Sequence, residues 1–121
     1  MSETVGVEMT ETVGSPVCVA ADDGNLVFEK IAKALAEDSK VTLSFSNVDT
    51  ITSAFLNAAV GQLFGRFDAE KIAASLEFTD ADEEDRFLLK RVIARAKAYF
   101  SDPERFERRR AELAEEDGRD D

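Results

Sequence analysis

Residues 41–57 decide the fold of this chain, and they read VTLSFSNVDTITSAFLN. Residues 41–46 alternate large apolar with small hydroxylated side chains, which is the pattern of a half-buried strand. Residues 47–51 predict a turn. From Thr52 or Ser53 onward, apolar residues recur every three or four positions as far as Phe67, which predicts an amphipathic helix. A strand that leads directly into such a helix is typical of α/β domains.

The remaining segments continue this alternation of strands and helices. Residues 4–13 alternate apolar and polar side chains and predict a half-buried strand or a short hairpin, and residues 73–78 predict another short strand. Residues 26–37 and 88–100 carry apolar side chains at helical spacing. We therefore expect an α/β fold with a small parallel or mixed sheet of about four strands, three amphipathic helices and a charged C-terminal helix.

Two short motifs predict local details of this fold. Asp80 and Glu83 have the spacing of a capping box, which indicates the start of the third amphipathic helix. Gly61 and Gly65 lie four positions apart in the second predicted helix. Small residues at that spacing favour close packing, here of the helix against the sheet.

The 121 residues suit one domain, with a charged extension at its end. We expect the α/β domain to cover residues 1–102. Residues 103–121 consist mostly of Glu, Asp and Arg, so we expect a solvated helix that frays into disorder.

The charge of the chain excludes several kinds of partner. Twenty-six acidic and 15 basic side chains give a net charge of -11, which repels nucleic acids and anionic membranes at long range. The acidity fits either a salt-rich cytoplasm or an ordinary acidic protein. The N-terminus lacks the basic residues of a signal peptide and no apolar run is long enough to cross a membrane, so we expect a soluble cytoplasmic protein.

The residue inventory excludes many enzyme mechanisms. The chain has no histidine and a single cysteine, Cys18, which removes the usual zinc sites, the Ser-His-Asp and Cys-His triads and any internal disulfide. Cys18 lies in an apolar run, residues 16–20, typical of a small buried side chain. We expect no catalytic activity, no bound metal and no cofactor.

Residues 41–63 resemble the STAS-like family, a family of uncharacterised bacterial and archaeal domains. Gly14-Ser15 and residues 85–93 fit the same pattern, so that the resemblance covers about residues 5–100. The family is similar in fold to the STAS domains of anti-sigma factor antagonists and sulfate transporters. The resemblance therefore implies the fold of those domains.

In the anti-sigma factor antagonists, a strand leads into Asp-Ser-Ser-Gly and the second serine is phosphorylated by a kinase. On this chain Ser53 falls on that serine and Thr52 on the first, while Ile51 replaces the aspartate and Ala54 the glycine. Asp49 lies two residues before Ile51 and supplies a similar charge. From the residues alone, Thr52 and Ser53 either cap the helix or accept a phosphate.

The resemblance implies a regulatory protein-interaction module whose partner is a kinase-like, ATP-binding protein. We expect its docking surface to include exposed polar residues around the turn and the following helix, namely Asn47, Asp49, Asn57, Gln62 and Arg66. Two alternatives remain open. The same helix start can hold a small ligand or a nucleotide phosphate, or the chain is a structural subunit that self-associates through Phe106 and Leu113 of its C-terminal segment.

Overall fold

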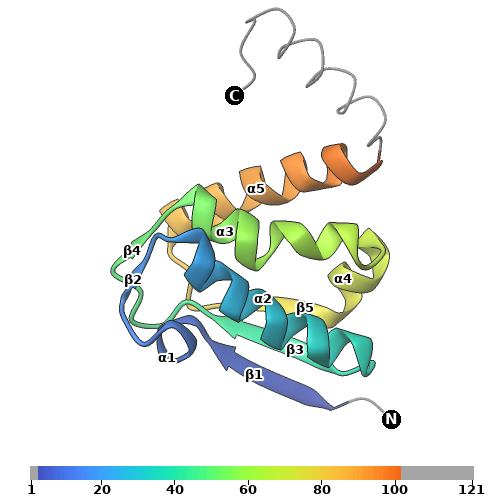
Figure 1. Ribbon diagram of the computed structural model, residues 1–121, viewed down its shortest axis with the longest axis horizontal. Helices are drawn as coiled ribbons and strands as arrows, with labels where there is room; N and C mark the ends of the chain where they lie inside the picture. The colour runs from blue at the N-terminus through green and yellow to red at the C-terminus, as the bar shows by residue number, and fades with distance from the viewer. Residues whose placement is uncertain (1–2, 102–121) are drawn as a thin grey trace, which may run out of the picture.

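The computed structural model describes residues 3–101 of the chain, and the predicted C-terminal helix therefore lies outside the described residues. The strands are β1 (Thr4–Glu8), β2 (Val17–Cys18), β3 (Lys40–Ser44), β4 (Thr50–Ile51) and β5 (Leu76–Thr79). The helices are α1 (Met9–Val13), α2 (Ala21–Ala36), α3 (Ser53–Ala59), the 3-10 helix η1 (Gly61–Gly65), α4 (Ala69–Ser75) and α5 (Glu83–Ser101) (Figure 1).

The predicted α/β fold is confirmed, with a sheet that is wholly parallel. β3 lies in the centre, between β1 and β5. In this register Val41 pairs with Val5 and Leu76, and Leu43 pairs with Val7 and Phe78. The alternation in β3 therefore sends one set of side chains into the core, where Val41 and Leu43 are fully buried.

The strand count differs from the expected four, because the described residues hold five strands in two sheets. The second sheet is the short parallel pair β2–β4, in which Cys18 lies opposite Ile51. A strand of two residues is too short to show an alternation of apolar and polar side chains. For this reason β4 lies in a segment where the sequence predicts a turn. This pair places the start of α2 beside the start of α3.

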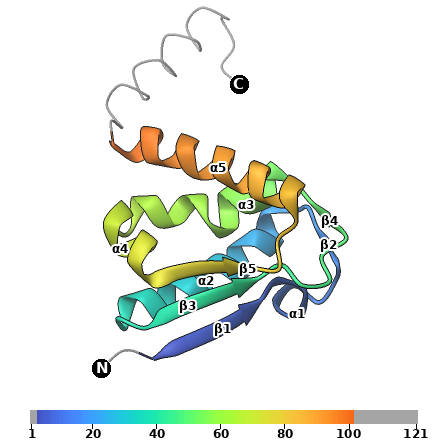
Figure 2. The ribbon, with the colours of Figure 1, turned by 180° about the vertical axis from the view of Figure 1, so that it is seen from behind.

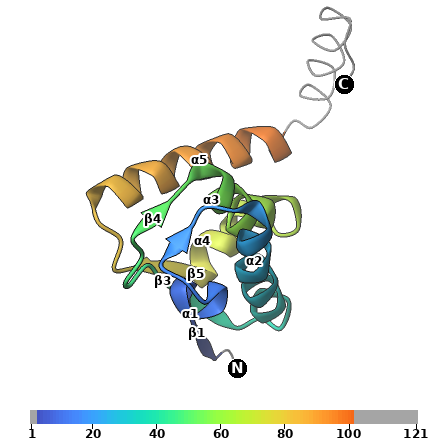
Figure 3. The ribbon, with the colours of Figure 1, turned by 60° about the vertical axis from the view of Figure 1, so that its left-hand side comes forward.

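The helices form successive layers on one side of the three-stranded sheet. α2 contacts β1 and β3 and packs most extensively against α3. α5 packs against α3 and η1, and it lies on the far side of these helices from the sheet (Figure 2). Figure 3, turned by 60° from the view of Figure 1, shows β2 and β4 at one end of the helical layers, where α2 and α3 begin.

The predicted strand over residues 4–13 is wrong in its second half, which forms α1. Met9 is fully buried and Val13 packs against the core, and these positions lie one helical turn apart. The helix ends at Gly14, which has a φ of 83° and donates its N–H to the carbonyl of Thr10. The four-residue spacing of Met9 and Val13 is hard to recognise in the sequence, because the alternating residues of β1 come directly before it.

The predicted long helix to Phe67 begins as expected but is interrupted at Val60, where α3 gives way to η1. In this stretch α5 packs against η1. A Cβ atom on Gly65 would lie 2.7 Å from the ring of Phe100, and one on Gly61 would meet Val92 and Ala96. Gly65 therefore permits close packing against a helix, and not against the sheet as predicted, whereas an added Cβ on Gly61 would make only ordinary contacts.

The third strand and the third helix also start later than predicted. Residues 73–75 belong to α4, where Ala73 and Ala74 are good helix formers, and β5 begins at Leu76. The predicted cap of Asp80 with Glu83 is wrong: a carboxylate oxygen of Asp82 accepts the N–H of Asp85 at 2.8 Å. Asp80 has a φ of 62° and accepts a hydrogen bond from Ser44 Oγ.

Candidate functional site

The β4–α3 junction is organised by the hydroxyl group of Thr52. As the N-cap of α3, Thr52 accepts the backbone N–H of Phe55 at 3.2 Å. The same hydroxyl donates to the carbonyl of Val19 at 2.9 Å. One side chain thus caps α3 and ties it to the segment between β2 and α2, so this hydroxyl has a structural role.

Ser53, the other predicted phosphoacceptor, lies in a different environment. Its side chain is exposed, and its hydroxyl makes no hydrogen bond with any residue that the structure describes. Ser53 lines a small cavity of about 60 Å³ together with Asn57 of α3 and Arg91 and Arg95 of α5. Of the two hydroxyls, only that of Ser53 is both accessible and close to cationic side chains.

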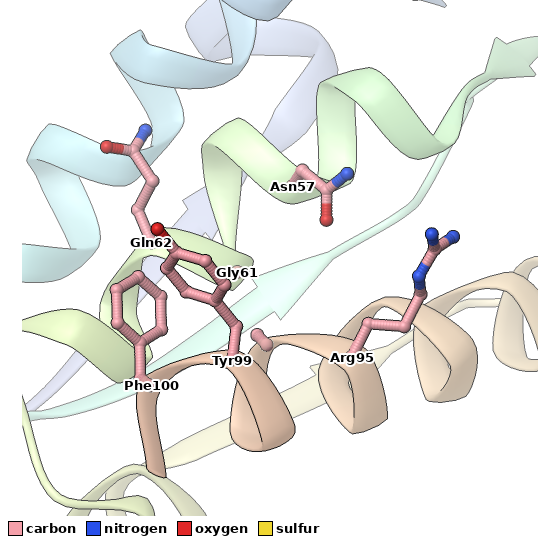
Figure 4. Close-up of a pocket in the computed structure, with 7 residues that line it drawn as sticks. Asn57, Gly61, Gln62, Arg95, Tyr99 and Phe100 are labelled. Atoms are coloured by element: carbon pink, nitrogen blue, oxygen red, sulfur yellow. The ribbon is translucent and has the colours of Figure 1, made fainter. Parts of the chain in front are cut away.

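A larger cavity continues from this point between η1 and α5. It measures about 360 Å³, and Asn57 and Arg95 line both cavities. Asn57 and Arg95 project into the space between α3 and α5, and Tyr99 rises from α5 beside Gly61 (Figure 4). We call the two cavities together the α3–α5 groove; its main polar and aromatic side chains are Asn57, Gln62, Arg91, Arg95, Tyr99 and Phe100.

Two of the residues predicted to bind a partner lie in this groove. Asn57 is exposed, and its side chain has no hydrogen-bond partner within residues 3–101. Gln62 donates its amide to Asn25 Oδ1 at 2.8 Å and to the carbonyl of Ala58 at 2.9 Å. Gln62 therefore holds η1 against α2.

The other three predicted residues do not line the groove. Asn47 is exposed in the loop after β3, with a φ of 67°. Asp49 is exposed two residues later, and its backbone N–H donates to the carbonyl of Pro16. Arg66 lies over the ring of Phe28, 5.5 Å from its centroid. Their role in binding stays a prediction.

The arginines of α5 were not among the predicted site residues. Arg91 lies over the ring of Phe87 at 5.9 Å, and Arg95 makes no ion pair or hydrogen bond with any described residue. The sequence could have indicated them as binding residues, because α5 carries no acidic residue from Arg86 onward. Its cations in that stretch are Arg86, Lys90, Arg91, Arg95 and Lys97.

The family follows from a comparison with protein-family models. The model of the STAS-like domain of unknown function (DUF4325) matches residues 23–86, more than half of the chain. The chain belongs to this STAS-like family. The comparisons with curated proteins and with solved structures gave no match.

The segment that matches the STAS-like family contains the residues of one wall of the groove and ends before the groove residues of the other wall. It runs from the first turn of α2 to the first turn of α5 and includes Ser53, Asn57 and Gln62. Arg91 and Arg95 follow it in the chain. One wall of the groove therefore lies within the family pattern, and the other lies beyond it.

Cys18 lies apart from the groove and is fully buried, as predicted. Burial, and to a smaller extent the negative charge of Asp23, raise the pKa of its thiol. The thiol is thus a poor nucleophile at neutral pH. Within residues 3–101 the STAS-like domain has no group of three or more potential metal ligands, and no helix there is long and apolar enough to cross a membrane.

Proposed function

We propose that this STAS-like domain is a non-catalytic regulatory module that binds a protein partner, in a role resembling that of an anti-sigma factor antagonist. Its docking surface comprises the β4–α3 junction and the α3–α5 groove. Phosphorylation of Ser53 controls the docking. The partner implied by the resemblance is a kinase-like, ATP-binding regulator.

The observation that supports this proposal is the contrast between Thr52 and Ser53. The hydroxyl of Thr52 is engaged in two hydrogen bonds that hold α3 in place. The hydroxyl of Ser53 is exposed and engaged in none with the described residues, so a kinase can modify it without breaking the fold. Ser53 is also the position that the resemblance assigns to the phosphoacceptor.

A phosphate on Ser53 would change the charge of the docking surface. It adds roughly -2 at neutral pH, beside Arg91 and Arg95 in the same small cavity. The phosphate would compete with any acidic group of the partner for these two cations. We therefore expect phosphorylation to weaken docking.

A binding role without catalysis fits the side chains that are present. The chain has no histidine, and its single cysteine is buried with a raised pKa. Asp85, whose pKa is raised mainly by burial and then by the charges of Asp82 and Glu84, lies in the first turn of α5 and lines neither cavity of the groove. A cytoplasmic location fits the free thiol of Cys18.

The test is to purify the native protein, Ser53→Ala and Ser53→Asp from the source cell and to identify bound proteins and phosphosites by mass spectrometry. We expect a kinase-like partner with the native protein and with Ser53→Ala, but not with Ser53→Asp. Thr4→Asp is the matched control, since Thr4 is exposed at the start of β1, away from the groove. It should retain the partner.

Two results would overturn this proposal. The first is an unmodified Ser53 together with the same partners for all variants. The second is tight binding of a nucleotide by the purified domain, which would favour the small-ligand alternative. Self-association through Phe106 and Leu113 concerns residues outside the described part of the chain and stays a prediction, tested by the mass of the protein after deletion of residues 103–121.

A further inference from the structure

The charges of this chain are segregated in a way that the net charge of -11 conceals. Acidic residues dominate the segment from β1 to the first turn of α5, whereas α5 from Arg86 to Ser101 carries only basic charges. The α3–α5 groove runs along this basic helix. The basic residues of this stretch do not share one face: Arg91 and Arg95 line the groove, whereas Arg86 and Lys90 line a separate hollow with Glu83 and Glu84. The groove therefore presents two arginines, and a ligand that approaches them is selected for negative charge.

In the groove, Arg91 and Arg95 are placed to act together. They lie four residues apart, on one face of α5, and both line the small cavity beside Ser53. The structure shows a single ion pair between described residues, Lys71 with Asp38, which lies elsewhere. Within residues 3–101, no carboxylate lies within ion-pair distance of Arg91 or Arg95.

The far end of the groove has a different character. Tyr99 and Phe100 pack edge to face, with ring centroids 4.8 Å apart, and Gly61 and Ala96 leave space beside them. Asn57 lies between this aromatic end and Arg95 (Figure 4), and Gln62 lines the same cavity beside the rings. Amides at such a position pair with the N–H and C=O groups of an extended backbone.

We infer that the α3–α5 groove binds an acidic peptide segment of a partner protein. Carboxylates of the segment bind Arg91 and Arg95, its backbone lies along Asn57 and Gln62, and an apolar side chain packs at Tyr99 and Phe100. The inference rests on the proposed function in taking the ligand to be a protein, but it does not depend on phosphorylation of Ser53. Its basis is charge complementarity along a groove of mixed polarity.

The probe is a short fluorescein-labelled peptide of alternating glutamate and leucine, titrated with the purified protein and followed by fluorescence anisotropy. A second peptide with glutamine in place of each glutamate is the control. We expect saturable binding of the acidic peptide alone, weakened by added salt. Arg91→Gln and Arg95→Gln should each weaken it by about tenfold or more, since each removes a charge-assisted contact.

The matched control variant is Lys40→Gln, which removes one exposed positive charge at the start of β3. It should leave the affinity unchanged. In ¹H–¹⁵N NMR spectra, the side-chain amide signals of Asn57 and Gln62 should shift on addition of the acidic peptide. Because Arg91 and Arg95 are exposed, their variants should keep the native circular dichroism spectrum.

Several results would overturn the inference. Equal binding of both peptides, or an equal loss in Lys40→Gln and Arg95→Gln, would mean that the groove does not select carboxylates. Displacement by millimolar inorganic phosphate would indicate a small-anion site. A dimer in sedimentation that Arg95→Gln dissociates would identify a second copy as the occupant. If the peptide fails but the Ser53 variants still differ in partner binding, the proposed function stands without this ligand.

Discussion

Thr52 donates its hydroxyl proton to the backbone carbonyl of Val19, which lies 33 positions earlier in the chain. The bond joins the two β–α junctions of the domain, one before α2 and one before α3. The same oxygen also caps α3 through Phe55 N, so one side chain links the start of α3 to the segment before α2. Ser53 and Asn57, four positions apart on α3, both line the small cavity against α5.

Loss of this hydroxyl should destabilise the domain. Thr52→Ala removes the cap and leaves the Val19 carbonyl without its donor, so we expect the free energy of unfolding to fall by about 1–2 kcal/mol. Thr52→Ser keeps the hydroxyl and should retain most of the native free energy of unfolding. Ser53→Ala should stay within about 0.5 kcal/mol of the native value, since an exposed hydroxyl is lost. Urea unfolding measures all three, and equal losses for Thr52→Ala and Ser53→Ala would contradict the assignment of roles.

The contact between α2 and α3 depends on the absence of a side chain at Gly24. A Cβ atom there would lie 2.5 Å from the carbonyl oxygen of Phe55 and 2.8 Å from Ala58 Cβ, so the helices would have to separate. We expect Gly24→Ala to lower the free energy of unfolding by about 2 kcal/mol, although alanine favours a helix. Gly6→Ala is the control, because nothing lies within 4 Å of its added Cβ. A neutral or stabilising Gly24→Ala would show that the interface is looser than described.

Two aspartates should influence the pH dependence of stability in opposite directions. Burial, and then the charges of Asp82 and Glu84, raise the pKa of Asp85, so its ionisation favours the unfolded chain as the pH rises through the acidic range. A hydrogen bond and the charge of Lys71 lower the pKa of Asp38, so its contribution is present at neutral pH and is lost as the pH falls.

The measurement is the melting temperature of Asp85→Asn and Asp38→Asn from pH 3 to pH 7. Relative to the native protein, Asp85→Asn should become more stable as the pH rises, and Asp38→Asn less stable. Asparagine tolerates the φ of 61° at position 38, so backbone strain does not confound the comparison. Parallel changes in the two variants would contradict these pKa directions.

The elements with strong periodicity could be predicted from the sequence, and the weak ones could not. β3, α2 and α5 each have a pattern long enough to show its period, and each is present. The errors occur where a segment is too short to show one, as in α1 and β4, or where the helix is interrupted, as at Val60. Tertiary packing, and not local preference, decides those positions.

The site was predictable in part for the same reason. Ser53 and Asn57 follow from the start of an amphipathic helix, which the sequence indicates directly. Arg91 and Arg95 belong to another helix, and no local pattern says that α5 covers α3 rather than the sheet. The sequence shows that they have no acidic neighbours in α5, but only the packing of α5 against α3 and η1 places them in a groove.

The most direct test of a binding role for the junction and the groove is hydrogen–deuterium exchange of the native protein with and without the partner that co-purifies with it. We predict slower exchange in residues 50–59 and 86–101, which form β4, α3 and the basic part of α5. Protection confined to the outer strands β1 and β5, or the recovery of no partner, would contradict the account.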